Sequence, residues 1–165
     1  MDKLINKLSA LYPQLQFCQA ERFYWSPKEH KVFYRSKNRD DYLWKLLHEV
    51  SHALLKHKSY RSDIELLKLE VAAWDKAQNL ATDFKVPVID DDYIQDCLDT
   101  YRDWLHKRST CPKCGTRSLQ ESTELYRCFN CRAEWRVSSS RFCRTYREVN
   151  RYGKLIPGTE QAIFS

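Results

Sequence analysis

Three residues in the first half of the chain, His48, Glu49 and His52, have the types and spacing of a metal site that activates water. Residues four positions apart lie on nearly the same face of an α-helix, so both imidazoles can direct a ring nitrogen at one ion. Glu49 lies one position further round the helix, where its carboxylate can reach a water on that ion. Zinc lowers the pKa of such a water, and a carboxylate then removes a proton as the water attacks a peptide carbonyl. The pattern predicts a catalytic zinc bound by His48 and His52, with Glu49 as the base.

A catalytic zinc typically has three protein ligands, so a third residue must complete this site. The candidates are Glu70, Glu65 and His57. Glu70 is preferred, because the small residues Ala72 and Ala73 that follow it let two helices approach closely. Glu65, on the same expected helix, is the reserve. His57 could reach the ion only if the first helix ended before it and the chain then turned sharply.

A second metal site is indicated by four of the seven cysteines, which form two CxxC pairs separated by 13 residues. Cys111 and Cys114 make the first pair, and Cys128 and Cys131 make the second. This spacing is strong evidence for a tetrahedral zinc bound by four thiolates, and Gly115 suits the tight turn after the first pair. Such a site has no open position, so we expect a structural zinc that stabilises a segment too short to have its own core.

Helical periodicity surrounds the first site. Apolar residues recur at spacings of three and four from about residue 40. A second helix is predicted from a cap at 62–63 to about residue 83, and the acidic run 90–92 begins a third that reaches about residue 106. A short amphipathic helix is also expected at 2–11. The chemistry-bearing residues His48, Glu49, His52 and Glu70 therefore fall on helices.

Short strands are expected at 15–17, 22–25 and 31–34, the last two joined by a polar turn as a β-hairpin. Together the elements predict an α+β fold in which helices pack on a small antiparallel sheet. If the strand at 31–34 forms an edge of that sheet, it could hold an extended peptide by strand addition.

The segment from Leu47 to His57, followed by Glu70-Val-Ala-Ala-Trp74, resembles the ImmA/IrrE-like zinc metallopeptidases. The resemblance covers about residues 15–85. It implies a compact zincin-like (gluzincin) domain, with His48, His52 and Glu70 as zinc ligands and Glu49 as the base. Members of the family include proteases that cleave helix-turn-helix repressors, so the resemblance implies a protein substrate of that kind. The chain departs from the family at Val71, where alanine is frequent, and in its cysteine-rich segment.

Two other functions remain open. SprT-like proteases also join an HExxH domain to a zinc ribbon and act on DNA-associated protein, but their third ligand is a histidine, for which only His57 and His106 are available. The second alternative is a non-catalytic adaptor that binds nucleic acid or protein through the ribbon. In either case we expect a metallopeptidase-like domain at 1–108, a zinc ribbon at 109–137 and a basic tail at 138–165.

Charge is unevenly distributed along the chain. Residues 1–100 hold 15 Lys/Arg and 16 Asp/Glu, whereas residues 101–165 hold 13 and 6. A basic C-terminal region that also carries aromatic residues is typical of nucleic-acid surfaces, although it is equally consistent with a solubilising surface. The basic and aromatic residues of the ribbon are Lys113, Arg117, Tyr126, Arg127, Phe129, Arg132, Trp135 and Arg136. Neither a signal peptide nor a membrane-spanning run is apparent, so a cytoplasmic location is expected.

Overall fold

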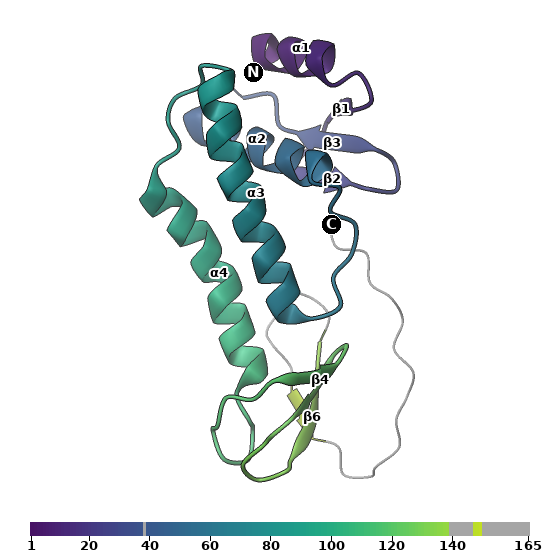
Figure 1. Cartoon of the computed structure of the whole chain (residues 1–165), viewed down its shortest axis with the longest axis vertical. Coiled ribbons are helices and arrows are strands. Elements are labelled where there is room, and N and C mark those ends of the chain that lie inside the picture. The colour runs from purple at the N-terminus through teal and green to yellow at the C-terminus, as the bar shows by residue number, and fades with distance from the viewer. Residues whose placement is uncertain (38, 139–146, 150–165) are drawn as a thin grey trace. The chain divides into compact units, whose positions relative to one another are not determined.

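The computed structural model describes residues 1–37, 39–138 and 147–149. Four helices and seven strands lie within these residues (Figure 1). The helices are α1 (Asp2–Leu11), α2 (Asp40–Leu54), α3 (Asp63–Asp83) and α4 (Asp91–Ser109). The strands are β1 (Gln16–Gln19), β2 (Tyr24–Ser26), β3 (Lys31–Tyr34), β4 (Gln120–Ser122), β5 (Leu125–Arg127), β6 (Glu134–Val137) and β7 (Arg147–Val149). The predicted α+β class is confirmed, and both sheets are small.

The chain divides into two compact units. The first contains Met1–Ser59 and Lys68–Gln95, and the second contains Tyr60–Leu67 and the described residues from Asp96 onward. The division falls inside α3 and α4, so the second unit is larger than the ribbon expected at 109–137. Most of the tail expected at 138–165, including Arg141, Arg144, Arg151 and Lys154, lies outside the described residues.

The first unit contains a three-stranded sheet with the order β1-β3-β2. The predicted hairpin is confirmed, since β2 pairs antiparallel with β3 and Trp25 lies opposite Val32. β1 adds a parallel pairing that the prediction did not contain. β3 is consequently the central strand, and the expectation that 31–34 could form an edge is wrong. Its backbone groups are already paired on both sides by β1 and β2.

Helix α2 packs against β2 and β3, and α1 packs beside β1 (Figure 1). Leu46, Leu47 and Val50 on α2 are fully buried, as is Val32 on β3. These apolar contacts fix the rotation of α2 about its axis, because the helix can bury only one such stripe against the sheet.

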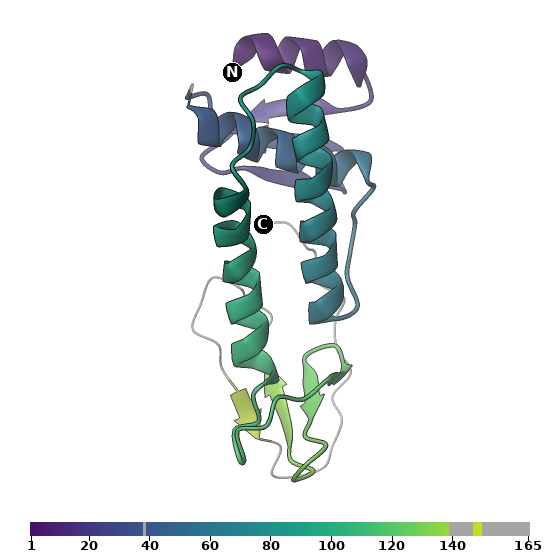
Figure 2. The ribbon, with the colours of Figure 1, turned by 60° about the vertical axis from the view of Figure 1, so that its left-hand side comes forward.

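The second unit contains the sheet β4-β5-β6-β7, in which each strand pairs antiparallel with the next (Figure 2). Its core consists of Tyr126, Trp135 and Val137 with two of the cysteines, Cys111 and Cys128. The rings of Tyr126 and Trp135 stack with centroids 5.5 Å apart. A sheet this small has little apolar core, which is why a metal cross-link would contribute much of its stability.

No helix among the residues that the structure describes is long and apolar enough to span a membrane.

Candidate metal centres

His48 and His52 lie one turn apart on α2, and both are buried. Their Nε2 atoms are 3.0 Å apart, so the two rings direct the same nitrogen at one point. Helical spacing produces this convergence, while the buried leucines of α2 anchor the helix to the sheet.

Glu70 on α3 supplies a carboxylate at the same point. Its Oε2 lies 3.1 Å from Nε2 of His48, and its Oε1 lies 3.6 Å from Nε2 of His52. Burial alone would raise the pKa of Glu70, but hydrogen bonds from His48 and His52 outweigh burial and hold it well below its usual range. The group is therefore a buried carboxylate that is stabilised in its ionised form.

These three side chains fit a metal ion. At zinc–ligand bonds of about 2.0–2.1 Å, tetrahedral geometry places neighbouring ligand atoms about 3.3 Å apart, close to the 3.0–3.6 Å separations here. Two imidazole lone pairs that face a carboxylate in the protein interior repel one another unless protons or a cation lie between them. His48, His52 and Glu70 thus form a buried group that could hold a metal ion.

The two other candidate ligands lie elsewhere. Glu65 accepts a hydrogen bond from the backbone N–H of Arg61 at 2.6 Å, and its own N–H donates to Ser62 Oγ, so it belongs to the N-terminal cap of α3. Nδ1 of His57 lies 2.8 Å from Nδ1 of His52. The other ring nitrogen of His52, Nε2, is the one that faces Glu70. Burial and, after it, the neighbouring His52 lower the pKa of His57 to about 4, so the ring is neutral near pH 7.

Glu49, the expected base, is half-buried between α2 and the sheet. Its Oε2 accepts a hydrogen bond of 2.9 Å from the backbone N–H of Trp25 on β2. The carboxylate is thereby held at a strand edge, one residue along α2 from His48.

Sequence reasoning missed two tryptophans that support the site. Trp74 stacks on the ring of His48 with centroids 4.1 Å apart, and the indole N–H of Trp25 donates to the carbonyl oxygen of His57 at 3.1 Å. The position of Trp74, four residues after Glu70, is a signal that could have been used, because residues at that spacing share a helix face. No comparable signal exists for Trp25, which approaches only through the folding of the sheet.

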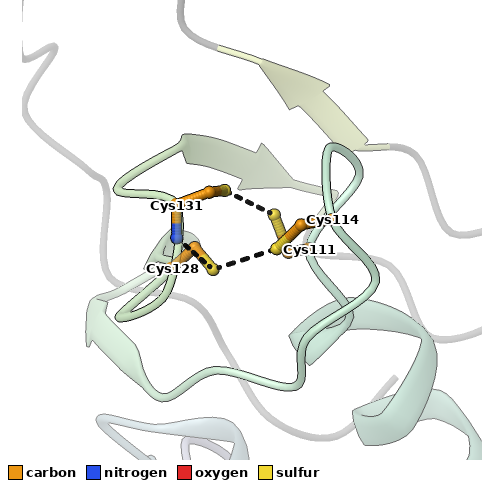
Figure 3. Close-up of side chains that lie close together, drawn as sticks. All are labelled: Cys111, Cys114, Cys128 and Cys131. Carbon is orange, nitrogen blue, oxygen red and sulfur yellow. Dashed lines mark hydrogen bonds between the residues drawn. The ribbon is translucent and has the colours of Figure 1, made fainter.

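The four cysteines of the CxxC pairs form the other group (Figure 3). Sγ of Cys111 lies 3.6 Å from Sγ of Cys131, and Sγ of Cys114 lies 3.5 Å from Sγ of Cys128. These separations are too long for disulfides and close to the spacing of about 3.8 Å between thiolates on one tetrahedral zinc. Gly115, with φ of 73°, adopts the left-handed conformation at the end of the first turn.

Proton affinity is divided unequally among the four thiols. Hydrogen bonding to Thr116 lowers the pKa of Cys114 to about 5. At Cys131 the backbone N–H of Ala133 favours the thiolate, but burial and the neighbouring thiols Cys114 and Cys111 outweigh it and raise the pKa to about 11. Four neighbouring thiolates would repel one another, so the thiols do not all lose their protons in the absence of a cation. A bound cation offsets this repulsion and favours the thiolate form.

Comparison with known proteins gives no relative: no family model, no curated protein and no solved structure matches the chain. By its fold and sites, the chain is an α+β protein with two groups of side chains that could bind metal ions. One group is His48, His52 and Glu70, and the other is the four cysteines.

Proposed function

We propose that the protein is a zinc-dependent endopeptidase, with one catalytic zinc at His48, His52 and Glu70 and one structural zinc at the four cysteines. The observation that carries the proposal is the convergence of two imidazoles and a buried carboxylate at 3.0–3.6 Å, next to Glu49 in an HExxH segment. The resemblance to ImmA/IrrE-like metallopeptidases supports the same ligand set.

The residues have separate roles in this proposal. His48, His52 and Glu70 hold the ion. Zinc bound there would supply a water of lowered pKa and polarise the substrate carbonyl. Glu49 accepts a proton from the attacking water and delivers it to the leaving amine. The hydrogen bond from the Trp25 N–H holds the Glu49 carboxylate in place.

A protein substrate follows from the resemblance, and a DNA-binding regulator such as a helix-turn-helix repressor is the preferred kind. An SprT-like role on DNA-associated protein is less favoured, because the third group beside the imidazoles is the carboxylate of Glu70 rather than a histidine.

Metal analysis and a trapping variant test the proposal. We expect two zinc ions per chain in the wild type and one in the double variant His48→Ala, His52→Ala. Glu49→Gln should keep both ions, abolish cleavage and retain the substrate in a pull-down. A wild-type chain with a single zinc, or cleavage that persists in Glu49→Gln, would contradict the proposal.

A second function is supported by the surface of the ribbon. Phe129, between the cysteines of the second pair, is 64% exposed. Lys113, Arg117 and Arg132 are also exposed, and the described part of the chain shows no ion pair for any of them. Arg127 differs, because it pairs with Glu121 and Glu134. An exposed aromatic ring and exposed cations on the same ribbon suit a single-stranded nucleic acid, which would stack a base on Phe129 and place phosphates beside the cations.

Fluorescence anisotropy with a labelled single-stranded oligonucleotide tests this second function. Phe129→Ala should weaken binding about tenfold, in line with one stacked base, and Lys113→Gln should lower both the affinity and its salt dependence. Leu119→Ala is the control, since Leu119 is 72% exposed and neither aromatic nor charged. Equal losses in Phe129→Ala and Leu119→Ala would contradict a stacking surface.

A further inference from the structure

We infer that His57 is a positioning residue of the metal centre: it accepts the Nδ1 proton of His52 and so keeps Nε2 of His52 free to bind the ion. The inference rests on the proposed function, since it assigns a role at the same site.

The contact between the two rings is short and buried. Nδ1 of His52 and Nδ1 of His57 are 2.8 Å apart, and both residues are buried. One nitrogen of such a pair must carry the hydrogen and the other must accept it. A histidine that binds a metal through Nε2 has its only N–H on Nδ1, so His52 is the donor and His57 the acceptor.

A hydrogen bond donated by the ring nitrogen that does not bind the metal fixes the tautomer and the ring orientation of a histidine ligand. At His52 the usual carboxylate or carbonyl acceptor is replaced by a second imidazole. At His48 the corresponding Nδ1 is buried and has no hydrogen-bond partner among the described residues. Of the two imidazole ligands, His52 is therefore the one whose tautomer the protein determines.

The backbone holds His57 at this position through the end of α2. Lys56 has φ of 58°, the N–H of Lys56 donates to the carbonyl of Ala53, and the N–H of His57 donates to the carbonyl of His52. These two bonds make a Schellman motif, which brings the third residue after the end of the helix at Leu54 beside the third-last helical position. His57 and His52 occupy those two positions, so the helix terminus itself creates the contact.

A strand of the sheet adds a further constraint. The indole of Trp25, which is 3% exposed, donates to the carbonyl oxygen of His57 at 3.1 Å. The backbone N–H of the same residue donates to Glu49. Trp25 therefore fixes both the base and the residue that orients a ligand, and His57 is held by side chain, N–H and carbonyl together.

Zinc affinity and the tautomer of His52 test the inference. In His57→Phe, which keeps a flat ring but removes the acceptor, we expect zinc affinity at this centre to fall 10–100-fold, measured by competition with a chromophoric chelator. His57→Asn supplies a side-chain oxygen as acceptor and should recover part of that loss. His106→Phe is the matched control, because His106 is exposed on α4, and it should leave the affinity unchanged.

Nitrogen-15 NMR of the imidazoles in the zinc-loaded wild type gives a readout that needs no variant. We expect His52 with its proton on Nδ1 and His57 with its proton on Nε2. A proton on Nδ1 of His57, or unchanged affinity in a folded His57→Phe, would overturn the inference while leaving the proposed function intact. A wild type that binds zinc only at the cysteines would instead refute the proposed function itself.

Discussion

The two glutamates near the start of α3 show how burial decides the role of a residue. Glu70 is 2% exposed and faces two imidazoles. Glu65 lies five positions earlier, on another face of the helix, and bonds the N–H of Arg61. Both are carboxylates on one helix, yet only Glu70 is a buried charge for which a cation would be stabilising, since the described residues that face it are the imidazoles of His48 and His52.

The variants Glu70→Gln and Glu65→Gln therefore make a matched pair. Glu70→Gln removes the negative charge without changing the shape of the side chain, so we expect the chain to retain one zinc per molecule after dialysis instead of two. Glu65→Gln should retain both, since an amide oxygen can still accept the bond at the cap. Elemental analysis of the two purified proteins measures the difference, and equal zinc content in both would argue against Glu70 as a ligand.

At the scale of the elements, the ends of α2 and α3 have the same construction. Lys56 after α2 and Lys85 after α3 both have positive φ, 58° and 55°. The bonds from Lys85 to Thr82 and from Val86 to Ala81 repeat those at the end of α2. A lysine in the left-handed conformation is unfavourable by about 1–2 kcal/mol. Each of these helix ends therefore forms despite an unfavourable backbone conformation at its lysine.

Substitution at these two lysines separates helix termination from metal binding. Lys56→Gly and Lys85→Gly should each raise the free energy of unfolding by about 0.5–1 kcal/mol, because glycine adopts positive φ readily. Lys56→Val and Lys85→Val should both lower it, since a β-branched residue disfavours this conformation. Only Lys56→Val should also weaken zinc binding, as only that turn positions His57. Urea unfolding and chelator competition measure the two effects, and a comparable loss of zinc affinity in Lys85→Val would contradict this assignment.

A buried ion pair links three elements of the second unit. Nε of Arg108 on α4 lies 2.6 Å from Oδ2 of Asp63 at the start of α3, and the hydroxyl of Tyr126 on β5 donates to the same oxygen at 2.6 Å. Arg108 also donates to the carbonyl of Ser138. Burial, followed by the charge of Asp63, raises the pKa of Tyr126 far above its usual value, so the phenol stays a donor.

Asp63→Asn should lower the free energy of unfolding by about 3 kcal/mol, because it leaves the Arg108 guanidinium buried without its counter-ion. Asp99→Asn is the control: its pair with Arg102 is largely exposed and should contribute less than about 1 kcal/mol. Urea unfolding of zinc-saturated protein compares the two variants. Similar small losses in both would show that the buried pair contributes no more than a surface one.

The sequence predicts the parts of this molecule that depend on local spacing. Helical periodicity placed His48, Glu49 and His52 on one helix and Glu70 on the next, and the CxxC pairs located the cysteine group. The parallel pairing of β1 with β3 could not be predicted, because strand order depends on tertiary packing. The roles of His57 and Trp25 were missed for a related reason: one needs a left-handed residue at Lys56, where glycine would be the usual signal, and the other needs the sheet to pack on α2.

Over the whole molecule, the two groups that could bind metal ions differ in donor type and in the structure around them. The first consists of two imidazoles on α2, which packs against a sheet, and a buried carboxylate on α3. The second consists of four thiols, two of which, Cys111 and Cys128, belong to the core of a small sheet. Thiolates bind zinc more tightly than harder ligands do, so the two ions should be removable separately, and the consequences of removal should differ.

Cys114→Ser tests this difference, with Cys97→Ser as the matched control outside both groups. Cys114→Ser should lose the ribbon zinc, and the environment of Trp135, which is fully buried beside Cys111 and Cys128, should change with it. The near-UV circular dichroism of that tryptophan should therefore collapse, while zinc at His48, His52 and Glu70 remains. A mild chelator applied to the wild type should have the reverse effect, removing the zinc of the first unit and leaving the Trp135 signal intact. If Cys97→Ser loses as much near-UV signal as Cys114→Ser, or if the chelator releases both ions in one step, the two sites are not independent.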